Sequence, residues 1–464
     1  MNLLKRAAKR VFYRIPIQYR HGRRFRKSYR FVMQSQWWSN AELREYQMRQ
    51  LSSLLQHAYQ HVPFYQRTFD EHGIKPRDIH DFESFQRVPF LTKEDIRLHA
   101  AELSASNIPR DRMEWETTGG STAEPLGLFV ERGSGALRLA LESRQWNWMR
   151  FAFGDRYVVL RGAIVDGCGW RKEKRWQLDP KRNCLLLSTF DMTQDNIADY
   201  AAMIEEFRPA MIRGYPSALE LFAKYLREVG GTINRTGVIR SISSSSETLF
   251  PIQRRLIEET FGCPVFDLYG NGELAGKMGE CERHEGFHDF MEFGYTEILH
   301  RNGLAVSEEG EVGEMVVTGF TNYAFPIIRY KIGDLCRYTS KTCSCGRGLS
   351  LIGGVQGRVQ ELVVAEDGGL IPLGPVIFGI HDPGWQRVRQ LRFVQEVAGR
   401  LRIEVVKSGG QTDGEMIHYV HRLFAERFKR RVHLDVHVVN NIETSGAGKH
   451  KYLIQKLAVP QVEN

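Results

Sequence analysis

The stretch PVFDLYGNGE (264–273) decides the fold that the sequence predicts. It begins as an apolar, β-rich run and ends in Tyr269-Gly270-Asn271-Gly272-Glu273, where glycines place an acidic side chain in a turn directly after a strand. Taken alone, the motif indicates only a turn. Its meaning depends on the sequence around it.

Short β-rich runs alternate with helix-like segments on both sides of this stretch. One helix is expected at 217–229, with Ser217 as its N-cap and Gly230-Gly231 as its end. The β-rich runs are RYVVLRG (156–162), PAMIRGY (209–215), GVIRSIS (237–243) and GEMVVTGF (313–320). This rhythm predicts an α/β fold in which helices cover a sheet.

The bulk composition is that of a globular protein. The 464 residues are 42% hydrophobic and 26% charged, which suits a large catalytic core with a smaller domain. No run approaches the roughly 18 to 20 apolar residues of a membrane-spanning helix, and the N-terminus lacks the apolar stretch of a secretory signal. We therefore expect a cytoplasmic protein.

The net charge of +9 is local to one end of the chain. Of 64 Lys and Arg residues, 11 lie in residues 1–30 together with no acid, so 53 remain against 55 acidic residues. The nearly neutral body gives no reason to expect a nucleic-acid partner. The basic N-terminal arm, residues 1–40, either contacts an anionic membrane at its periphery or a partner, or is a solvated arm.

Two domains are expected after the arm. A helix with apolar side chains at helical spacing at 41–62, ended by Pro63, opens a large N-terminal domain, 41–356. Near residue 357 the pattern changes to strand, loop, strand, helix and strand, which predicts a small α+β domain, 357–464.

Four further motifs accompany Tyr269–Glu273. They are TTGGSTAEP (117–125), RYKIGD (329–334), Gly357-Arg358 and TSGAGK (444–449). A loop of glycines and hydroxyl residues can cradle a pyrophosphate, because its backbone N–H groups approach phosphate oxygens closely. The first loop is not a usual P-loop, since no Gly-Lys-Ser or Gly-Lys-Thr follows it. Each motif singly indicates no more than a turn.

Together, in this order, the five motifs resemble those of the adenylate-forming superfamily of acyl-CoA synthetases, adenylation domains and luciferases. Within it the chain resembles the phenylacetate-CoA ligase branch and the CapK-type proteins of polysaccharide gene clusters. The likeness extends from VPFYQRTFDEHGIKP (62–76) and VPFLTKEDIR (88–97) to the C-terminal lysine loop. It implies a large N-terminal α/β domain and a small mobile C-terminal α+β domain. The implied activity is ATP-dependent activation of a carboxylic acid to acyl-AMP, with transfer to CoA.

The resemblance also implies a nucleotide site. Tyr269 would stack on adenine, and Asp334 would accept hydrogen bonds from both ribose hydroxyls. The remaining nucleotide-binding residues would contact the phosphates, the purine edge or the hinge: Thr118, Gly119, Gly120, Ser121, Thr122, Ser246, Glu247, Gly270 and Arg358.

Two residues would act on the reaction itself. Glu273 would help to ligate Mg²⁺, which neutralises charge on the phosphates. Lys449 would stabilise the negative charge that builds on the carboxylate and the α-phosphate. Lys451 is its rival for this role. The chain departs from the family at Ala123, usually Gly, and at Gly272, usually Ser or Thr.

A separate set of Cys and His residues suits a structural Zn²⁺. Cys343 and Cys345 lie in one tight Cys-x-Cys-Gly-Arg turn, and Cys281 with His288 can complete a tetrahedral Cys₃His set. The spacing of Cys281 and His288 is similar to that in phenylacetate-CoA ligase relatives. His284 is the rival fourth ligand, and buried thiols beside an unrelated histidine are the alternative.

Three other functions stay open at this stage. The acyl group could pass to an amine or hydroxyl, for instance on a sugar, or the adenylyl group could be the final product on a cofactor hydroxyl. A non-catalytic scaffold is disfavoured, because Glu273, Asp334, Arg358 and Lys449 are all retained. The sequence does not identify the carboxylic acid.

Overall fold

The computed structural model describes most of the chain. The described residues are 22–117, 126–152, 154–161, 176–179, 182–189, 192–300, 302–358, 361–378, 380, 382–444 and 449–457. They fold as two compact units. Unit 1 comprises Gly154–Asp267 and Gln356–Asn464, and unit 2 comprises Arg14–Phe153 and Leu268–Val355.

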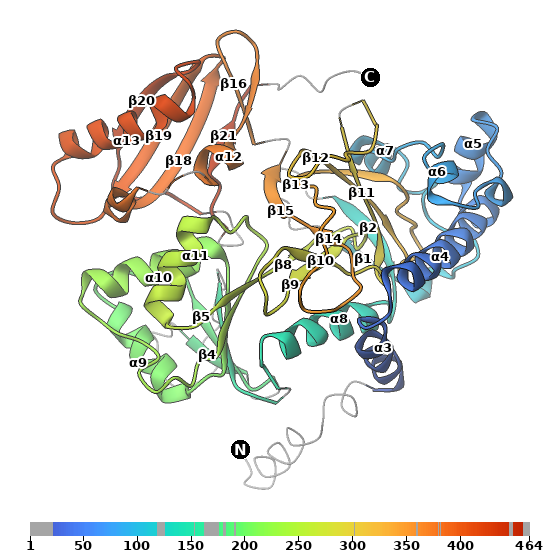
Figure 1. Cartoon of the computed structure of the whole chain (residues 1–464), viewed down its shortest axis with the longest axis horizontal. Helices are drawn as coiled ribbons and strands as arrows, with labels where there is room; N and C mark the ends of the chain where they lie inside the picture. The colour runs from blue at the N-terminus through green and yellow to red at the C-terminus, as the bar shows by residue number, and fades with distance from the viewer. Residues whose placement is uncertain are drawn as a thin grey trace, which may run out of the picture. The chain divides into compact units, whose positions relative to one another are not determined.

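Unit 2 begins with helices. The second of them, α4 (Asn40–His61), confirms the helix expected at 41–62: Ser39 and Glu42 form a capping box, and the buried stripe includes Leu43 and Leu51. Pro63 occupies the first position of the next helix, where its missing N–H costs nothing. The other helices are α3 (Gly22–Ser35), α5 (Pro63–Glu71), α6 (Phe82–Phe85), α7 (Lys93–Leu98) and α8 (Gly135–Trp148) (Figure 1).

The strands of unit 2 are antiparallel. A hairpin pairs β1 (Met113–Thr117) with β2 (Gly127–Glu131), and β12 (Val312–Gly319) lies between β11 (Gly294–Leu299) and β13 (Tyr330–Arg337). The remaining pairs join the last residues of β8 (Val265–Gly270) to β9 (Lys277–Glu280), β9 to β10 (Phe287–Asp289) and β10 to β14 (Leu351–Ile352).

The first part of unit 1 is a parallel sheet with helices. Its strand order is β7 (Ser241–Ser245), β6 (Met211–Gly214), β3 (Tyr157–Arg161) and β5 (Cys184–Ser188), with β4 (Trp176–Asp179) antiparallel at the edge. The helices are α9 (Ile197–Phe207), α10 (Pro216–Glu228) and α11 (Pro251–Phe261). These elements confirm the predicted α/β class.

The predicted N-cap of α10 is wrong. Tyr215 occupies the cap position, Pro216 begins the helix, and no side chain of the cap residue closes it. Pro216 is favoured there because its fixed backbone angle suits the first helical turn. The Ser217 side chain is instead bonded to Glu247, 3.0 Å away.

The C-terminal part of unit 1 is a mixed sheet with one long helix. The expected pattern of strand, strand, helix and strand is confirmed as β18 (Val388–Val397), β19 (Arg400–Lys407), α13 (Asp413–Arg427) and β20 (His433–Val438) (Figure 1). The sheet order is β20-β19-β18-β21, with β21 at Leu453–Gln455. Shorter elements precede it: β16 (Leu362–Val364), β17 (Leu370–Pro372), α12 (Leu373–Phe378) and a 3₁₀ turn, Pro383–Arg387. The strand β15 (Gly354–Arg358), which begins in unit 2, is the last in the sheet order β11-β12-β13-β15. The domain boundary at 357 stays a prediction.

None of the helices in the described ranges has the length and apolarity needed to cross a bilayer.

The interior of unit 2 contains an ion pair. Arg144 on α8 and Glu292 are both 0% exposed, and their side-chain nitrogen and oxygen lie 2.5 Å apart. The Ser35 hydroxyl of α3 also donates to Glu292, and Arg144 donates to the Val32 carbonyl. Two chain segments far apart in sequence, α3 and the residues after β10, are therefore joined through α8.

Removing Glu292 should destabilise the fold strongly. Glu292→Ala leaves the Arg144 guanidinium buried without its counter-charge, so we expect the free energy of unfolding to fall by about 3 to 5 kcal/mol, measured by denaturant unfolding. The control is Glu45→Ala, which breaks an ion pair with Arg49 whose two side chains are 71% and 57% exposed. That control should cost no more than about 1 kcal/mol. Equal costs would contradict this account of Glu292.

Candidate active site

Two of the predicted nucleotide-binding residues meet in unit 2. The Tyr269 hydroxyl, at the end of β8, donates to Oδ2 of Asp334 in β13 at 2.6 Å. Asp334 is 5% exposed. The ring expected at adenine and the carboxylate expected at ribose are thus in direct contact, although they come from separate strands.

Glu273 lies in the turn that follows β8. Its carboxylate accepts a hydrogen bond from the Tyr330 hydroxyl at 3.3 Å. The turn is fixed by Asn271, whose side-chain oxygen accepts from the backbone N–H groups of Ala275 and Gly276 at 2.9 and 3.1 Å. The acidic side chain therefore extends from a braced turn close to the start of β13.

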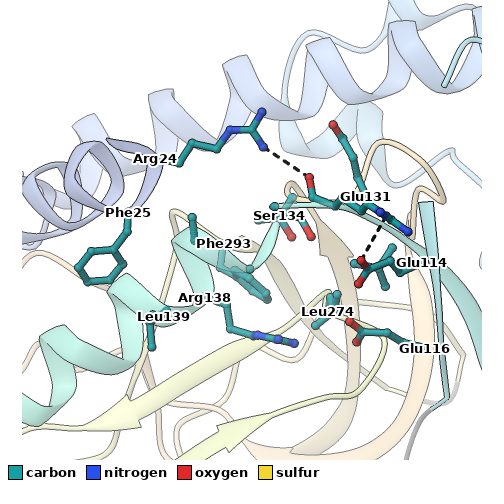
Figure 2. Close-up of a pocket in the computed structure, with 16 residues that line it drawn as sticks. Arg24, Phe25, Glu114, Glu116, Glu131, Ser134, Arg138, Leu139, Leu274 and Phe293 are labelled. Carbon is teal, nitrogen blue, oxygen red and sulfur yellow. Dashed lines mark hydrogen bonds and ion pairs between the residues drawn. The ribbon is translucent and has the colours of Figure 1, made fainter. Parts of the chain in front are cut away.

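The predicted phosphate loop, Thr118 to Thr122, lies outside the described residues. The hairpin that carries it is described, and its last paired residues are Thr117 and Gly127. Along this hairpin, from Glu116 beside Thr117 to Glu131 at the other end, a cavity of about 430 Å³ is lined by charges of both signs and reaches Leu274, next to Glu273 (Figure 2). It includes Glu114, paired with Arg132 at 3.2 Å, but none of Tyr269, Glu273 and Asp334.

Ser246 and Glu247, expected at the purine edge, follow β7 in unit 1. Ser246 has a φ of 72°, a left-handed conformation that is uncommon for residues with a side chain. The Glu247 carboxylate accepts from the Ser217 N–H and hydroxyl, both at 3.0 Å, and from the His450 N–H at 2.8 Å. Burial raises the pKa of Glu247 to about 7, against the opposing effects of these hydrogen bonds and of the Lys449 charge.

The two candidate lysines lie in unit 1. Lys449 is partly buried, with its Nζ 5.7 Å from the centre of the Tyr215 ring. It directly precedes His450, which is bonded to Glu247. Lys451 is also partly buried. Arg358 ends β15, and its side chain lies outside what the structure describes.

The predicted metal ligands converge in unit 2. The ligand atoms of Cys281, His288, Cys343 and Cys345 all lie within 4.8 Å of one another. The Sγ atoms of Cys281 and Cys343 are 3.6 Å apart, and Cys345 Sγ is 3.4 Å from His288 Nε2. Four ligands at zinc bond lengths of about 2.0 to 2.3 Å in a tetrahedron would be separated by roughly 3.5 to 3.8 Å. The donor set therefore fits Zn²⁺.

The rival ligand His284 lies apart from this set. Its Nδ1 is 3.4 Å from a carboxylate oxygen of Glu280. His288, in contrast, is fully buried in β10 with the Trp148 ring 5.5 Å away. The choice of His288 over His284 thus agrees with the geometry.

Sequence reasoning missed some contacts of the site. It gave no role to the Tyr330 hydroxyl beside Glu273 or to the His450 N–H beside Glu247. Every residue except proline has a backbone N–H, so the residue type at position 450 could not predict this hydrogen bond. Tyr330 lies inside the quoted motif RYKIGD and could have been considered.

Comparison with known proteins supports the resemblance. No family model matches the chain. It is 26% identical over 415 residues to a phenylacetate-coenzyme A ligase of Thermus thermophilus, covering 84% of this chain and 89% of that one. It is 21% identical over 429 residues to Protein CapK of Staphylococcus aureus, covering 90% of each. A crystal structure of 2-hydroxyisobutyryl-CoA ligase in the postadenylation state matches with a TM-score of 0.73, at 20% identity over 90% of each chain.

The chain therefore has the fold of the adenylate-forming enzymes. Within that class, its predicted resemblance to the phenylacetate-CoA ligase branch and to CapK is confirmed.

Proposed function

We propose that the protein is an ATP-dependent, AMP-forming acid-thiol ligase. The observation that carries the proposal is the contact between Tyr269 and Asp334, in a fold that adenylate-forming enzymes share. In the first step a substrate carboxylate attacks the α-phosphorus of ATP, and pyrophosphate leaves. In the second step the CoA thiol attacks the acyl carbonyl, and AMP leaves.

Each site residue has a physical role in this proposal. Tyr269 and Gly270 lie beside adenine, and the Asp334 carboxylate accepts hydrogen bonds from both ribose hydroxyls. Glu273 helps to hold Mg²⁺ on the phosphates, and Lys449 stabilises charge at the reacting carboxylate. The residues that complete nucleotide binding are Thr118, Gly119, Gly120, Ser121, Thr122, Ser246, Glu247 and Arg358. The small domain, 357–464, turns about a hinge at Arg358 between the two steps.

The lysine variants test the reaction. ATP–pyrophosphate exchange is measured against aryl acids, fatty acids, amino acids and uronic acids. We expect Lys449→Ala to lower the exchange rate by about two to three orders of magnitude, because it removes charge stabilisation at the reacting centre. Lys451→Ala, the matched control, should retain near-normal exchange. The reverse pattern would give the role to Lys451, and no exchange by the wild type with any acid would contradict an acid-activating function.

A second candidate differs only in the acceptor. The similarity to Protein CapK over 90% of the chain favours a role in polysaccharide biosynthesis, with an amine or hydroxyl of a sugar as acceptor. Incubation of the enzyme with ATP, acid and either CoA or amino sugars distinguishes the two, by mass spectrometry of the products. An adenylylated cofactor as the stable product would instead support transfer of the adenylyl group to a cofactor hydroxyl as the reaction of this enzyme.

We also propose one structural Zn²⁺ on Cys281, His288, Cys343 and Cys345. The support is the clustering of the four donor atoms within 4.8 Å of one another, with two of the pairs at 3.6 and 3.4 Å. Four protein ligands fill the coordination sphere, so the ion would clip two loops together and would take no part in the chemistry.

Elemental analysis tests the metal. Protein purified without added metal should contain about one zinc per chain, and Cys343→Ser should lose both the ion and thermal stability, since binding energy of a structural zinc is folding energy. His284→Ala should retain the zinc. Cys263→Ser, at a buried cysteine of unit 1, is the matched control and should also retain it. A wild type free of zinc would refute the site.

We propose that the protein is cytoplasmic and that its basic arm contacts an anionic membrane at the periphery. Its last part is α3, in which Phe25 and Val32 are buried. At about 3.6 residues per turn, the opposite face carries the exposed cations Arg23, Arg26, Lys27 and Arg30. Cations near anionic lipid contribute about 1 kcal/mol each.

Vesicle sedimentation tests this contact. The protein should pellet with phosphatidylglycerol vesicles at low salt, and replacing the four cations by Gln should lower binding by about three orders of magnitude. Four exposed cations elsewhere, Arg77, Arg97, Arg110 and Arg112, replaced in the same way, provide the control. Equal loss in both variants would indicate a general charge effect and contradict the proposal.

A further inference from the structure

Glu247 joins three segments of unit 1 through one carboxylate. Glu247 lies in the loop after β7. Its carboxylate accepts hydrogen bonds from the backbone N–H and the hydroxyl of Ser217, in the first turn of α10, at 3.0 Å each. Its third donor is the backbone N–H of His450, 2.8 Å away. A partly buried carboxylate that receives these three hydrogen bonds is a stronger acceptor than a neutral side chain.

The segment that carries Lys449 is also held by its neighbours. The His450 ring nitrogen Nε2 lies 2.7 Å from the Leu391 carbonyl. Gln253 donates to the Tyr452 hydroxyl at 2.7 Å, and the Tyr452 ring contacts Phe250 edge-on at 5.2 Å. His450 and Tyr452 thus anchor two positions of the segment that directly precedes β21. Lys449 precedes the first anchor by one residue.

We propose that Glu247 is a positioning residue that holds the segment of Lys449 in place for the adenylation step. The inference rests on the proposed function, in which Lys449 acts at the reacting carboxylate. It assigns the Glu247 side chain a task separate from the backbone contact to adenine that the resemblance implies.

Glutamine in this place cannot reproduce the contacts. The acceptor Oε1 receives the Ser217 hydroxyl and the His450 N–H, and Oε2 receives the Ser217 N–H. Either orientation of an amide would direct its NH₂ group at a backbone N–H, so one hydrogen bond is replaced by a clash of donors. The Lys449 segment would then lose its nearest anchor or strain α10.

A displaced lysine affects the reacting centre more than nucleotide binding. The rate depends steeply on the placement of a catalytic charge, whereas ATP affinity in this proposal comes chiefly from the residues in unit 2. The expected signature is a lowered kcat for adenylation with a nearly unchanged KM for ATP. A general loss of folded protein would not produce that signature together with a local change in backbone protection.

The experiment compares Glu247→Gln with Glu258→Gln. Glu258 is the matched control, because its carboxylate also accepts a backbone N–H in unit 1, that of Val265 at 2.9 Å. In ATP–pyrophosphate exchange, Glu247→Gln should lower kcat about tenfold or more and change the ATP KM less than about twofold, as expected for loss of a charge-assisted hydrogen bond. Glu258→Gln should match the wild type in both.

Hydrogen–deuterium exchange gives the second measurement. Amides of the peptide 449–457 should exchange about tenfold faster in Glu247→Gln than in the wild type and Glu258→Gln, because the His450 N–H loses its acceptor. A normal exchange rate of this peptide, or a normal kcat despite faster exchange, would overturn the proposal. If Glu247→Gln does not fold, Glu247→Asp keeps the charge, shortens the side chain and should show both effects in weaker form.

The outcome also separates this inference from the proposed function. A wild type that catalyses no exchange with any acid counts against acid activation. Deuterium uptake by the peptide 449–457 still tests the hydrogen bond between Glu247 and the His450 N–H in that case. Faster uptake in Glu247→Gln supports the conclusion that Glu247 holds this segment in place, and unchanged uptake refutes it.

Discussion

The ion pair between Arg144 and Glu292 is the interaction on which the arrangement of unit 2 depends. Both side chains are fully buried, and a charge taken out of water is costly unless an opposite charge and further hydrogen bonds accompany it. The pair therefore requires α8 to lie against the segment after β10. The apolar packing of Ala140, Leu141 and Trp148 on α8 accompanies this placement.

Two contacts of α8 reach the candidate sites. Glu142 of α8 pairs with Lys277 of β9 at 2.9 Å, and β9 is hydrogen-bonded to the end of β8, where Tyr269 lies. Trp148, at the other end of α8, packs on His288 in β10. The helix thus braces the strand before the Tyr269 turn and a member of the cysteine–histidine set, so one buried charge pair supports both.

The sequence predicted those features whose cause is local. The helix α4 followed from its apolar spacing, and the strands of unit 1 followed from β-rich runs, although their parallel pairing was not predicted. The four candidate metal ligands were predicted from two short motifs, yet their convergence accompanies the pairing of β10 with β14, a long-range contact that no spacing reveals. Ser217 failed as a predicted cap, because its hydroxyl is used by a carboxylate 30 residues away.

The burial of charged residues could not be predicted from the sequence either, because it also depends on long-range contacts. Glu220 and Lys224 have the spacing of an exposed helical pair, but both are buried, and Lys224 also donates to the Val388 carbonyl at 2.5 Å. Whether such residues face water or protein depends on what covers the helix. Here the cover is the start of β18, which belongs to the C-terminal part of the chain.

The contacts of this cover bear on the proposed turning of the small domain between the two steps. Its contacts with α10 and α11 include polar ones: Lys224 with Val388, Arg389 with Glu228 at 2.6 Å, and Tyr452 with Gln253 at 2.7 Å. Polar groups regain hydrogen bonds from water when they separate, so each contact contributes only about 0.5 to 1.5 kcal/mol net. An apolar interface of the same extent would lose all of its burial energy on opening. Phe250, which belongs to the C-terminal core cluster, and Ile252 add apolar packing to these contacts, and the Phe250 ring meets the Tyr452 ring edge-on at 5.2 Å.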